Sequence, residues 1–369
     1  MINDYIPNGQ PMQTPIIVCL TLLAPTLLLG QPAGDPASGS RSAVQTPHDN
    51  EIHFGSLRQL TFGGENAEAY FSFDERSLIF QSTRDAFRCD QQFIMDVTTG
   101  TTRLVSSGKG RTTCGYYLPG DTTILYATTQ FGSPDCPPSP DMSQGYVWAV
   151  YQDYDIVLAD TGGAILRRLT SSPGYDAEAT VSPLGDRIVF TSVRDGDLDL
   201  YSMKLDGSDV RRLTREIGYD GGAFYSWDGS MIVYRGWHYD DTTAAREYRS
   251  LLGRGLVRPS RMELFVMNAD GTGRRQLTYS GAANFAPFFH PDGRRIIFAS
   301  NLADPRGRDF DLYTIKVDGS GLKRITFNDT FDGFPMFTRD GKRLVFASNR
   351  GAGKRGETNI FIANWNETE

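Results

Sequence analysis

The sequence predicts an all-β fold: a single six-bladed β-propeller of four-stranded antiparallel blades. Three observations support this prediction. The composition, with 39 glycines and 12% aromatic residues, favours many short strands and tight turns over helices. Short strands of alternating apolar residues are separated throughout by turns that contain Gly and Asp. A five-residue ending also recurs along the chain, as LRRLT at 166–170, VRRLT at 210–214, RRQLT at 274–278 and LKRIT at 322–326.

Each repeat contains four predicted strands, which we call a, b, c and d in chain order. In residues 174–214, strand a is the apolar stretch 177–181, and strand b is RIVFTS at 187–192. Strand c is LYSMKL, and the Asp-Gly pair at 206–207 predicts a hairpin to strand d, because Gly tolerates positive φ. The b strands of the other five units are LIFQS at 78–82, ILYAT at 124–128, MIVYR at 231–235, RIIFAS at 295–300 and RLVFAS at 343–348.

The last unit predicts how the ring closes. Its strand c is NIFIANW at 359–365, and no arginine-rich strand d follows it. The stretch LRQLT at 57–61 has the form of a strand d but follows no strands a, b and c of its own. We expect 57–61 to pair with 359–365 and complete the last blade, which removes an exposed sheet edge.

Three features resemble the WD-like repeats of TolB-type β-propellers: SVRDGDLDLY at 192–201, HPDG at 290–293, and the L-T endings. The resemblance covers about residues 57–365 and is specific for the fold. TolB itself carries an additional α/β domain before its propeller, and we expect none here. Related propellers precede the catalytic domains of some peptidases, but this sequence has no G-x-S-x-G nucleophile elbow.

Residues 1–33 are predicted to be an apolar leader. The stretch PIIVCLTLLAPTLLLG at 15–30 carries no charge and is too short to span a bilayer comfortably, which indicates an export signal. The alternative is an anchor that is not cleaved. Residues 34–52 are predicted to be a disordered linker and residues 53–369 the propeller. We expect a periplasmic or secreted protein with no stable membrane insertion after the leader is removed.

Cysteine usage allows at most one intramolecular disulfide after the leader. Cys89, Cys114 and Cys136 remain, which is an odd number. The candidate pairs are Cys114–Cys136 and Cys89–Cys114. The spacing matches no zinc template, so we expect no metal at these residues.

The long insertions predict which face of the propeller carries function. The a–b and c–d turns are short, whereas the b–c links are extended. Because b–c and d–a links lie on the same face of a propeller, all of these insertions gather at one rim, where binding loops usually reside. The extended links are 129–153, 236–261, 301–309 and 349–358.

Aromatic residues in two of these links are the candidate ligand contacts. The first link contains Tyr146, Trp148 and Tyr151 beside a group of prolines, and the second contains Trp237 and Tyr239 before a predicted helix at 242–255. Aromatic side chains with a few polar groups suit extended peptides or sugars. The alternative interpretation is that they pack the loops against the blades.

The d–a links share a short polar residue near the predicted mouth of the central channel. Such residues commonly bond to nearby backbone and shape a turn. The functional alternative is a polar collar for a cation or for the amide and hydroxyl groups of a ligand, with Glu68 and Glu178 two positions further on. Oxygen ligands would suit calcium, although no D-x-D-x-D-G loop exists, and we expect no cofactor. The collar residues are Asn66, Thr112, Asp176, Asp220, Asn284 and Asp332.

Catalytic candidates are few. Among the histidines only His238 lies in a long b–c link, where Asp240, Asp241 or Glu247 could complete an acid–base pair. Acids at fixed repeat positions, such as Asp199 and Asp311, are interpreted as structural contacts within blades.

The sequence therefore favours an exported, non-catalytic propeller that binds a peptide, protein or glycan on the b–c face. One alternative is a polymer-directed hydrolase or lyase that uses His238 and carboxylates of the rim. Another is a partner in an envelope complex, as the TolB resemblance implies. A formal net charge of -7 and a pI near 5.3 argue against nucleic acid as a partner.

Overall fold

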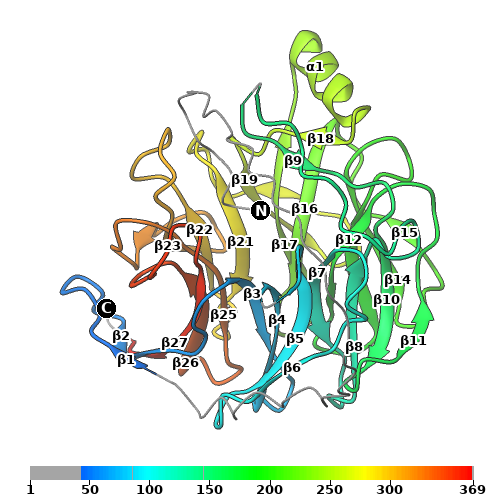
Figure 1. The fold of residues 1–369 in the computed structure, drawn as a ribbon. Coiled ribbons are helices and arrows are strands. Elements are labelled where there is room, and N and C mark those ends of the chain that lie inside the picture. Colours follow the sequence, from blue (N-terminus) through cyan, green and yellow to red (C-terminus); the bar gives the residue numbers. More distant parts are fainter. Residues whose placement is uncertain (1–42, 85, 144, 368–369) are drawn as a thin grey trace, which may run out of the picture.

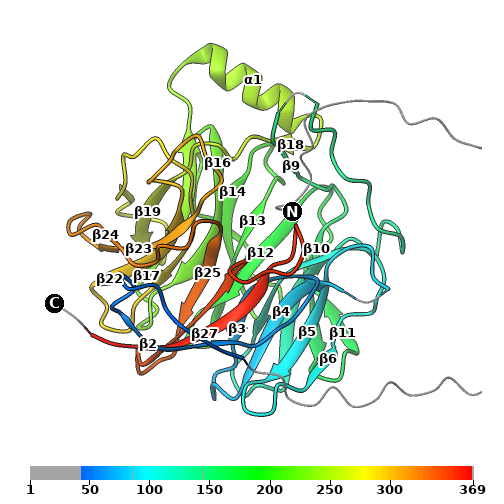
Figure 2. The ribbon, with the colours of Figure 1, turned by 60° about the vertical axis from the view of Figure 1, so that its left-hand side comes forward.

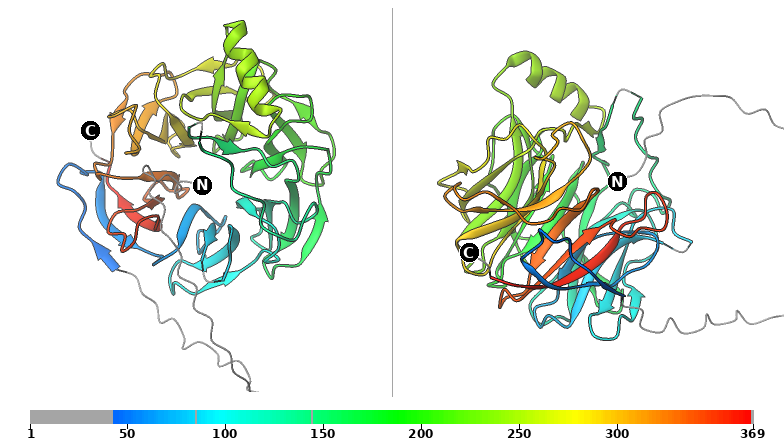
Figure 3. Two further views of the ribbon diagram at one scale, coloured as in Figure 1. Left: turned by 45° about the horizontal axis from the view of Figure 1, so that its top comes forward. Right: turned by 90° about the vertical axis from the view of Figure 1, so that its left-hand side faces the viewer.

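The computed structural model describes residues 43–84, 86–143 and 145–367. In this part of the chain six antiparallel sheets stand around a ring, accompanied by one α-helix (Figure 1; Figure 3, left). The predicted six-bladed propeller is confirmed.

Every blade has the order a, b, c, d across its sheet. Blade 1 consists of β3 (Glu65–Phe71), β4 (Ser77–Thr83), β5 (Gln91–Asp96) and β6 (Thr102–Leu104). Blade 2 consists of β7 (Thr112–Tyr117), β8 (Thr123–Thr128), β10 (Asp155–Asp160) and β11 (Ile165–Arg168). Blade 3 consists of β12 (Asp176–Val181), β13 (Arg187–Ser192), β14 (Asp199–Lys204) and β15 (Arg211–Arg212). Blade 4 consists of β16 (Gly218–Tyr225), β17 (Met231–His238), β19 (Glu263–Asn268) and β20 (Arg275–Gln276). Blade 5 consists of β21 (Asn284–Phe289), β22 (Arg295–Ser300), β23 (Asp311–Lys316) and β24 (Lys323–Arg324). Blade 6 consists of β25 (Asp332–Phe337), β26 (Arg343–Ser348), β27 (Asn359–Trp365) and β2 (Phe54–Gln59). The a strands contact one another in chain order, and β25 returns to β3, so they form the inner wall of the ring.

Blade 6 is built from both ends of the described chain. In β2, Leu57 lies opposite Ala363 of β27 and Arg58 lies opposite Ile362, and the backbone N–H of Leu60 donates to the carbonyl of Ile360 at 2.7 Å. Figure 2 shows β2 in blue beside β27 in red. The predicted closure is confirmed, with the strand at 54–59 rather than 57–61.

The folded region also includes residues 43–52, which the sequence analysis assigns to the linker. Strand β1 (Ala43–Gln45) pairs with the outer edge of β2 and makes blade 6 five-stranded. The buried side chain of Glu51 accepts a hydrogen bond from Arg350 at 3.0 Å. A polar segment is thus ordered by pairing rather than by apolar burial. The predicted leader and residues 34–42 lie outside the described residues.

The recurrent threonine ending has a structural role. In five blades the threonine after strand d accepts the backbone N–H of the second residue of strand c, and each such bond stabilises the blade by about 1 kcal/mol. In blade 6 this hydrogen bond joins the two ends of the described chain. The donor–acceptor pairs are Ile156–Thr170, Leu200–Thr214, Leu264–Thr278, Leu312–Thr326 and Ile360–Thr61, at 2.8–2.9 Å.

Cross-strand aromatic pairs fill the blades. In five of them an aromatic residue of strand b lies opposite one of strand c, with ring centroids 5.4–5.9 Å apart, which buries large apolar surface between neighbouring strands. The pairs are Phe80–Phe93, Phe190–Tyr201, Tyr234–Phe265, Phe298–Tyr313 and Phe346–Phe361.

The acids at fixed positions of strand c bind arginines of strand d, which agrees with the predicted structural role of these acids within blades. Asp199 pairs with Arg212 at 2.6 Å, and Asp311 pairs with Arg324 at 2.5 Å. Both aspartates have fully buried side chains, so they belong to the interior of their blades.

Two long b–c links meet above the ring. The link of blade 2 contains β9 (Trp148–Ala149), and the link of blade 4 contains β18 (Leu256–Val257); the two strands pair, although blade 3 lies between their blades. A further backbone bond joins the N–H of Val150 to the carbonyl of Gly255 at 2.7 Å. The stretches around Trp148 and Trp237 thus lie at the same end of the propeller, as predicted.

The helix α1 (Thr242–Leu252) stands on this same face (Figures 1 and 2). It begins where the Asp241 carboxylate caps the backbone N–H groups of Thr243 and Ala244, a favourable arrangement at a helix N-terminus. Among the described residues, no helix has the length and the apolar character needed to span a membrane.

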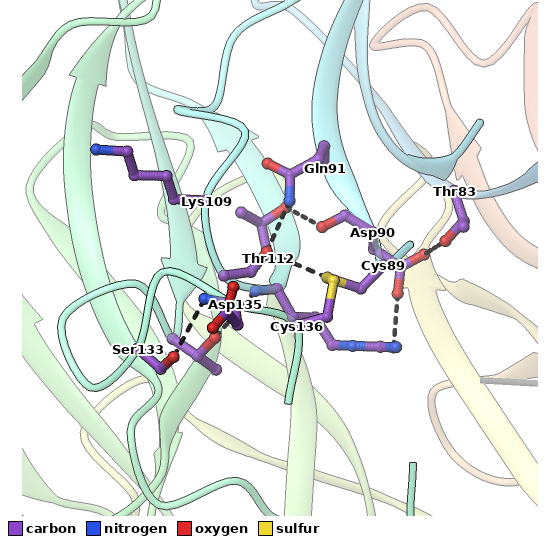
Figure 4. Close-up of a disulfide and its surroundings, with 12 residues drawn as sticks. Thr83, Cys89, Asp90, Gln91, Lys109, Thr112, Ser133, Asp135 and Cys136 are labelled. Carbon is purple, nitrogen blue, oxygen red and sulfur yellow. Dashed lines mark hydrogen bonds and ion pairs between the residues drawn. A yellow bond between two sulfur atoms is a disulfide. The ribbon is translucent and has the colours of Figure 1, made fainter. Parts of the chain in front are cut away.

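One disulfide links the b–c links of blades 1 and 2, and it joins Cys89 to Cys136 (Figure 4). The predicted pairs Cys114–Cys136 and Cys89–Cys114 are therefore wrong. Cys89 and Cys136 both lie in loops of the same face, whereas Cys114 lies on the innermost strand β7 and carries a free thiol. Asp90, beside the disulfide, accepts a bond from Thr83 at 2.7 Å (Figure 4). It also accepts a bond from Arg111 at 2.9 Å.

Candidate functional site: the central cavity

A cavity of about 410 Å³ lies at the centre of the ring on the face of the long b–c links. Its floor is formed by the innermost strands. Its roof is formed by residues 146–150, 257–260 and 305–308, from the b–c links of blades 2, 4 and 5. Rigid strands and three loops thus enclose one site.

A bulge recurs in every innermost strand and shapes the floor. Two residues after the short polar residue near the start of each strand, the chain adopts a positive φ of 48–58°, and the pairing register with strand b shifts there. Five of these six residues line the cavity. The six are Glu68, Cys114, Glu178, Gly222, Ala286 and Phe334.

One side of the floor carries a bonded acid–arginine group. Arg235 donates to Glu178 at 2.5 Å and to the hydroxyl of Tyr219 at 2.7 Å. Burial opposes the charge of Arg235, but the neighbouring Glu178 outweighs it and raises the pKa of the guanidinium. The guanidinium lies 5.4 Å from the ring centre of Trp148 and 5.7 Å from that of Phe285, so aromatic faces surround the cation.

Glu68 lies on the same side of the floor, but its carboxylate is not paired with an arginine as that of Glu178 is. Its Oε2 atom is buried and has no hydrogen-bond partner. Burial raises the pKa of this carboxyl, a bond from Cys114 lowers it, and the charge of Glu178 raises it further. Burial and the two nearby carboxylates also raise the pKa of the Cys114 thiol well above its usual range.

The opposite side of the cavity is apolar. The rings of Phe285, Phe310, Phe331 and Phe334 form a chain with centroids 5.6–6.0 Å apart. They come from blades 5 and 6, whereas the acids and the thiol come from blades 1 to 3. The cavity can therefore hold a ligand that has one polar and one apolar end.

Two of the five predicted ligand-contact aromatics lie in this cavity. The indole N–H of Trp148 donates to the hydroxyl of Tyr146 at 2.9 Å, and Trp148 packs on Phe285 at 5.2 Å. Trp148 thus joins the roof to the apolar side of the floor.

The other three aromatics contact loop structure outside the cavity lining. Tyr151 donates its hydroxyl to the carbonyl of Pro138, and Tyr239 stacks on Tyr248 of α1 at 5.0 Å. Trp237 is partly buried, beneath the guanidinium of Arg261 at 6.0 Å. These three positions fit the packing interpretation.

The six predicted collar residues are buried, and the structure places them at contacts between strands and loops. Asn66 donates to the carbonyl of Thr358 at 2.8 Å and thereby ties blade 1 to the end of blade 6. Asp176 binds Arg194 at 2.9 Å, and Asp332 binds Arg350 at 2.6 Å. The remaining partners are the carbonyl of Asp90 for Thr112, His238 for Asp220, and the carbonyl of Met262 for Asn284. Only Glu68 and Glu178 of the predicted collar line the cavity.

The structure does not bring His238 and the predicted acids together. The Nε2 atom of His238 lies 2.9 Å from Asp220, whose side chain is fully buried, and the imidazole packs on Phe265. Asp241 caps α1, and Asp240 is exposed. None of these residues lines the cavity.

Sequence reasoning missed Cys114, Arg235, Phe285 and Phe334. Aligning the six a strands places Cys114 and Phe334 at the position of Glu68 and Glu178, which is a signal that the sequence contains. No comparable signal marks Arg235, since it lies on a b strand where the other blades have smaller polar or apolar residues. Within the described ranges, no three His, Cys, Asp or Glu side chains come together as a metal site would need.

Comparison with known proteins supports this fold assignment. Residues 252–369 match the family described as the TolB beta propeller domain. The Tol-Pal system protein TolB of Bordetella pertussis is 42% identical over 50 residues, a match that covers 14% of this chain and 11% of that relative. The match thus spans a small part of the relative's length.

Solved structures show the same fold at low identity. TolB from Acinetobacter baumannii superposes with a TM-score of 0.56 and 18% identity over 79% of this chain and 65% of that chain. A putative TolB from Agrobacterium tumefaciens gives 0.51 and 16% over 83% and 91%. An oligogalacturonate lyase in complex with manganese gives 0.51 and 15% over 89% and 98%. Residues 252–369 are therefore similar to the TolB family of β-propeller domains, within a chain that folds as one six-bladed propeller over the residues described.

Proposed function

We propose that this protein is an exported binding module whose central cavity receives a segment of a peptide or protein partner. The observation that carries the proposal is the enclosure of one cavity by rigid inner strands and three b–c links, with Trp148 in the roof. Its volume, about 410 Å³, lies within the roughly 300–1,000 Å³ typical of ligand sites.

The lining favours a partner with mixed chemistry. Aromatic rings cover one side of the cavity and carboxylates the other, a combination that suits the side chains and backbone of an extended segment. The likeness to Tol-Pal system proteins supports a protein partner rather than a glycan. Export is supported by the apolar leader and by the Cys89–Cys136 disulfide, since such bonds persist in oxidising compartments.

The placement of His238 gives no support to a hydrolase or lyase. This residue lies outside the cavity lining and is held by Asp220. The likeness to an oligogalacturonate lyase, at 15% identity, concerns the fold alone.

Two tryptophan variants test the proposal. The purified protein is applied to peptide and glycan arrays, and its best ligand is then titrated against the native protein, Trp148→Ala and Trp237→Ala. We expect Trp148→Ala to weaken binding by about tenfold or more, because central aromatic anchors dominate binding energy. Trp237→Ala should bind like the native protein, since Trp237 lies outside the cavity lining.

Thermal melting of both variants checks that the propeller remains folded. Equal affinity of Trp148→Ala and Trp237→Ala for the ligand would contradict the assignment to the cavity. Selection of glycans alone by the arrays would contradict the assignment to a peptide or protein partner.

A further inference from the structure

The carboxylates of the cavity differ in their partners. Glu178 is paired with Arg235, and Asp90 is paired with Arg111 at 2.9 Å. For Glu68 the described residues provide a bond from Cys114 but no basic side chain within ion-pair distance, and its Oε2 atom is buried without a partner. The floor of the cavity thus carries an acid that has no ion-pair partner among the described residues.

The fold itself does not require an acid at this position. Gly222 and Ala286 occupy the same place in blades 4 and 5, and Glu68 adopts the positive φ of 51° that glycine would accept more easily. Burial of an unpaired carboxylate is a second cost. Glu68 thus combines a strained backbone conformation with a buried carboxylate that has no ion-pair partner. Such unfavourable features are typical of residues that serve binding.

The surroundings of Glu68 already accommodate a buried cation. Arg235 lies over the rings of Trp148 and Phe285 and beside Glu178. A second cation at Glu68 would have the phenyl groups of Phe331 and Phe334, on the neighbouring blade 6, for its apolar stem. The arginines of the roof, Arg306 and Arg308, are exposed, so solvent screens their charge.

We propose, on the basis of the proposed function above, that the cavity selects a cationic side chain of the partner segment. The ammonium of a lysine or the guanidinium of an arginine binds the Glu68 carboxylate, and the apolar stem packs on the aromatic side. Glu68 is thus the residue that determines which partner segments the cavity accepts.

The charged and titratable groups around Glu68 make this binding pH-dependent. They are Cys114 on β7, Glu178 on β12, Arg235 on β17 and Tyr70 on the same strand. Because the pKa of Glu68 is raised in the free protein, a cation that needs the carboxylate must displace a proton at lower pH. Affinity for a cation should rise with pH through this pKa and then become constant.

Matched small probes test the inference. Ligand-observed NMR measures the affinity of the purified protein for phenethylammonium and for its neutral analogue 2-phenylethanol. We expect the cation to bind at least about tenfold more tightly, as for other buried charge pairs. In Glu68→Gln this preference should disappear while 2-phenylethanol still binds. Glu65→Gln, an exposed acid on the same strand, should keep the preference.

The outcomes separate the two proposals. Equal affinity for both probes in the native protein, or a preference that survives Glu68→Gln, overturns the role of Glu68 but leaves a cavity that binds ligands. Binding of neither probe, together with no ligand on the arrays, overturns both. An affinity for the cation that is constant from pH 4.5 to pH 9 also contradicts the inference.

Discussion

His238 occupies in blade 4 the place that an arginine occupies in three other blades. Two positions after a serine near the end of strand b, Arg84, Arg194 and Arg350 lie over the aromatic pair of their blade and bind the short polar residue near the start of strand a. His238 packs on Phe265 and binds Asp220 in the same way. Burial lowers the pKa of His238, but the bond and charge of Asp220 outweigh it and raise the pKa above 6.5.

This contact predicts a pH-dependent contribution to stability. Since the pKa of His238 is higher in the folded than in the unfolded state, its stabilisation is fully present below pH 6.5 and is lost as the pH rises through the folded value. His238→Ala should lower the free energy of unfolding by roughly 1–2 kcal/mol at pH 5.5 and by less at pH 8.5. Denaturant unfolding at the two pH values measures the difference.

His238→Arg is the matched control. It should retain the contact with Asp220 at both pH values, because an arginine fills this place in blades 1, 3 and 6. An equal loss of stability in His238→Ala at both pH values would show that the contact with Asp220 does not cause a pH-dependent stabilisation. The contact of His238 was not predictable from the acids nearby in sequence, because its partner Asp220 lies on strand a, 18 residues earlier.

At the scale of elements, the b–c link of blade 2 is held at two points. The Cys89–Cys136 disulfide fixes one part, and pairing of β9 with β18 fixes the part that carries Trp148. Because this link forms much of the cavity roof, we expect its order and the affinity of the cavity to depend on both contacts.

Removal of the disulfide tests that dependence. The bond spans 47 residues, so Cys136→Ser should lower the free energy of unfolding by roughly 2–4 kcal/mol and expose the link to limited proteolysis. Cys114→Ser is the control, because Cys114 is outside the disulfide. Similar proteolysis of the native protein and Cys136→Ser would contradict a fixed roof.

The regular strands were predictable, since alternating apolar residues and Asp-Gly turns mark them. The strands β9 and β18 were not, because two-residue strands in long loops show no periodicity. The disulfide was also missed, although the alignment of the a strands already places Cys114 on an inner strand, away from the b–c link that contains Cys136. The bulges at Glu68 and Cys114 depend on pairing between strands, which a single strand's sequence does not show.

At the scale of the whole molecule, ring closure and the binding site are connected. The apolar side of the cavity includes Phe331 and Phe334 of blade 6, the blade completed by β2. The link from Thr61 to Ile360 and the pairing of β2 with β27 therefore support the cavity as well as the ring. The closure was predictable from sequence because the isolated LRQLT matches the strand missing from the last repeat.

The location of binding is most directly tested by hydrogen–deuterium exchange of the protein with and without its tightest array ligand. The ligand should slow exchange in residues 146–150 and 255–260 and in the inner strands β3, β7 and β12. Protection confined to α1, or to the turns of the opposite face such as 182–185 and 290–293, would contradict a binding site in the central cavity.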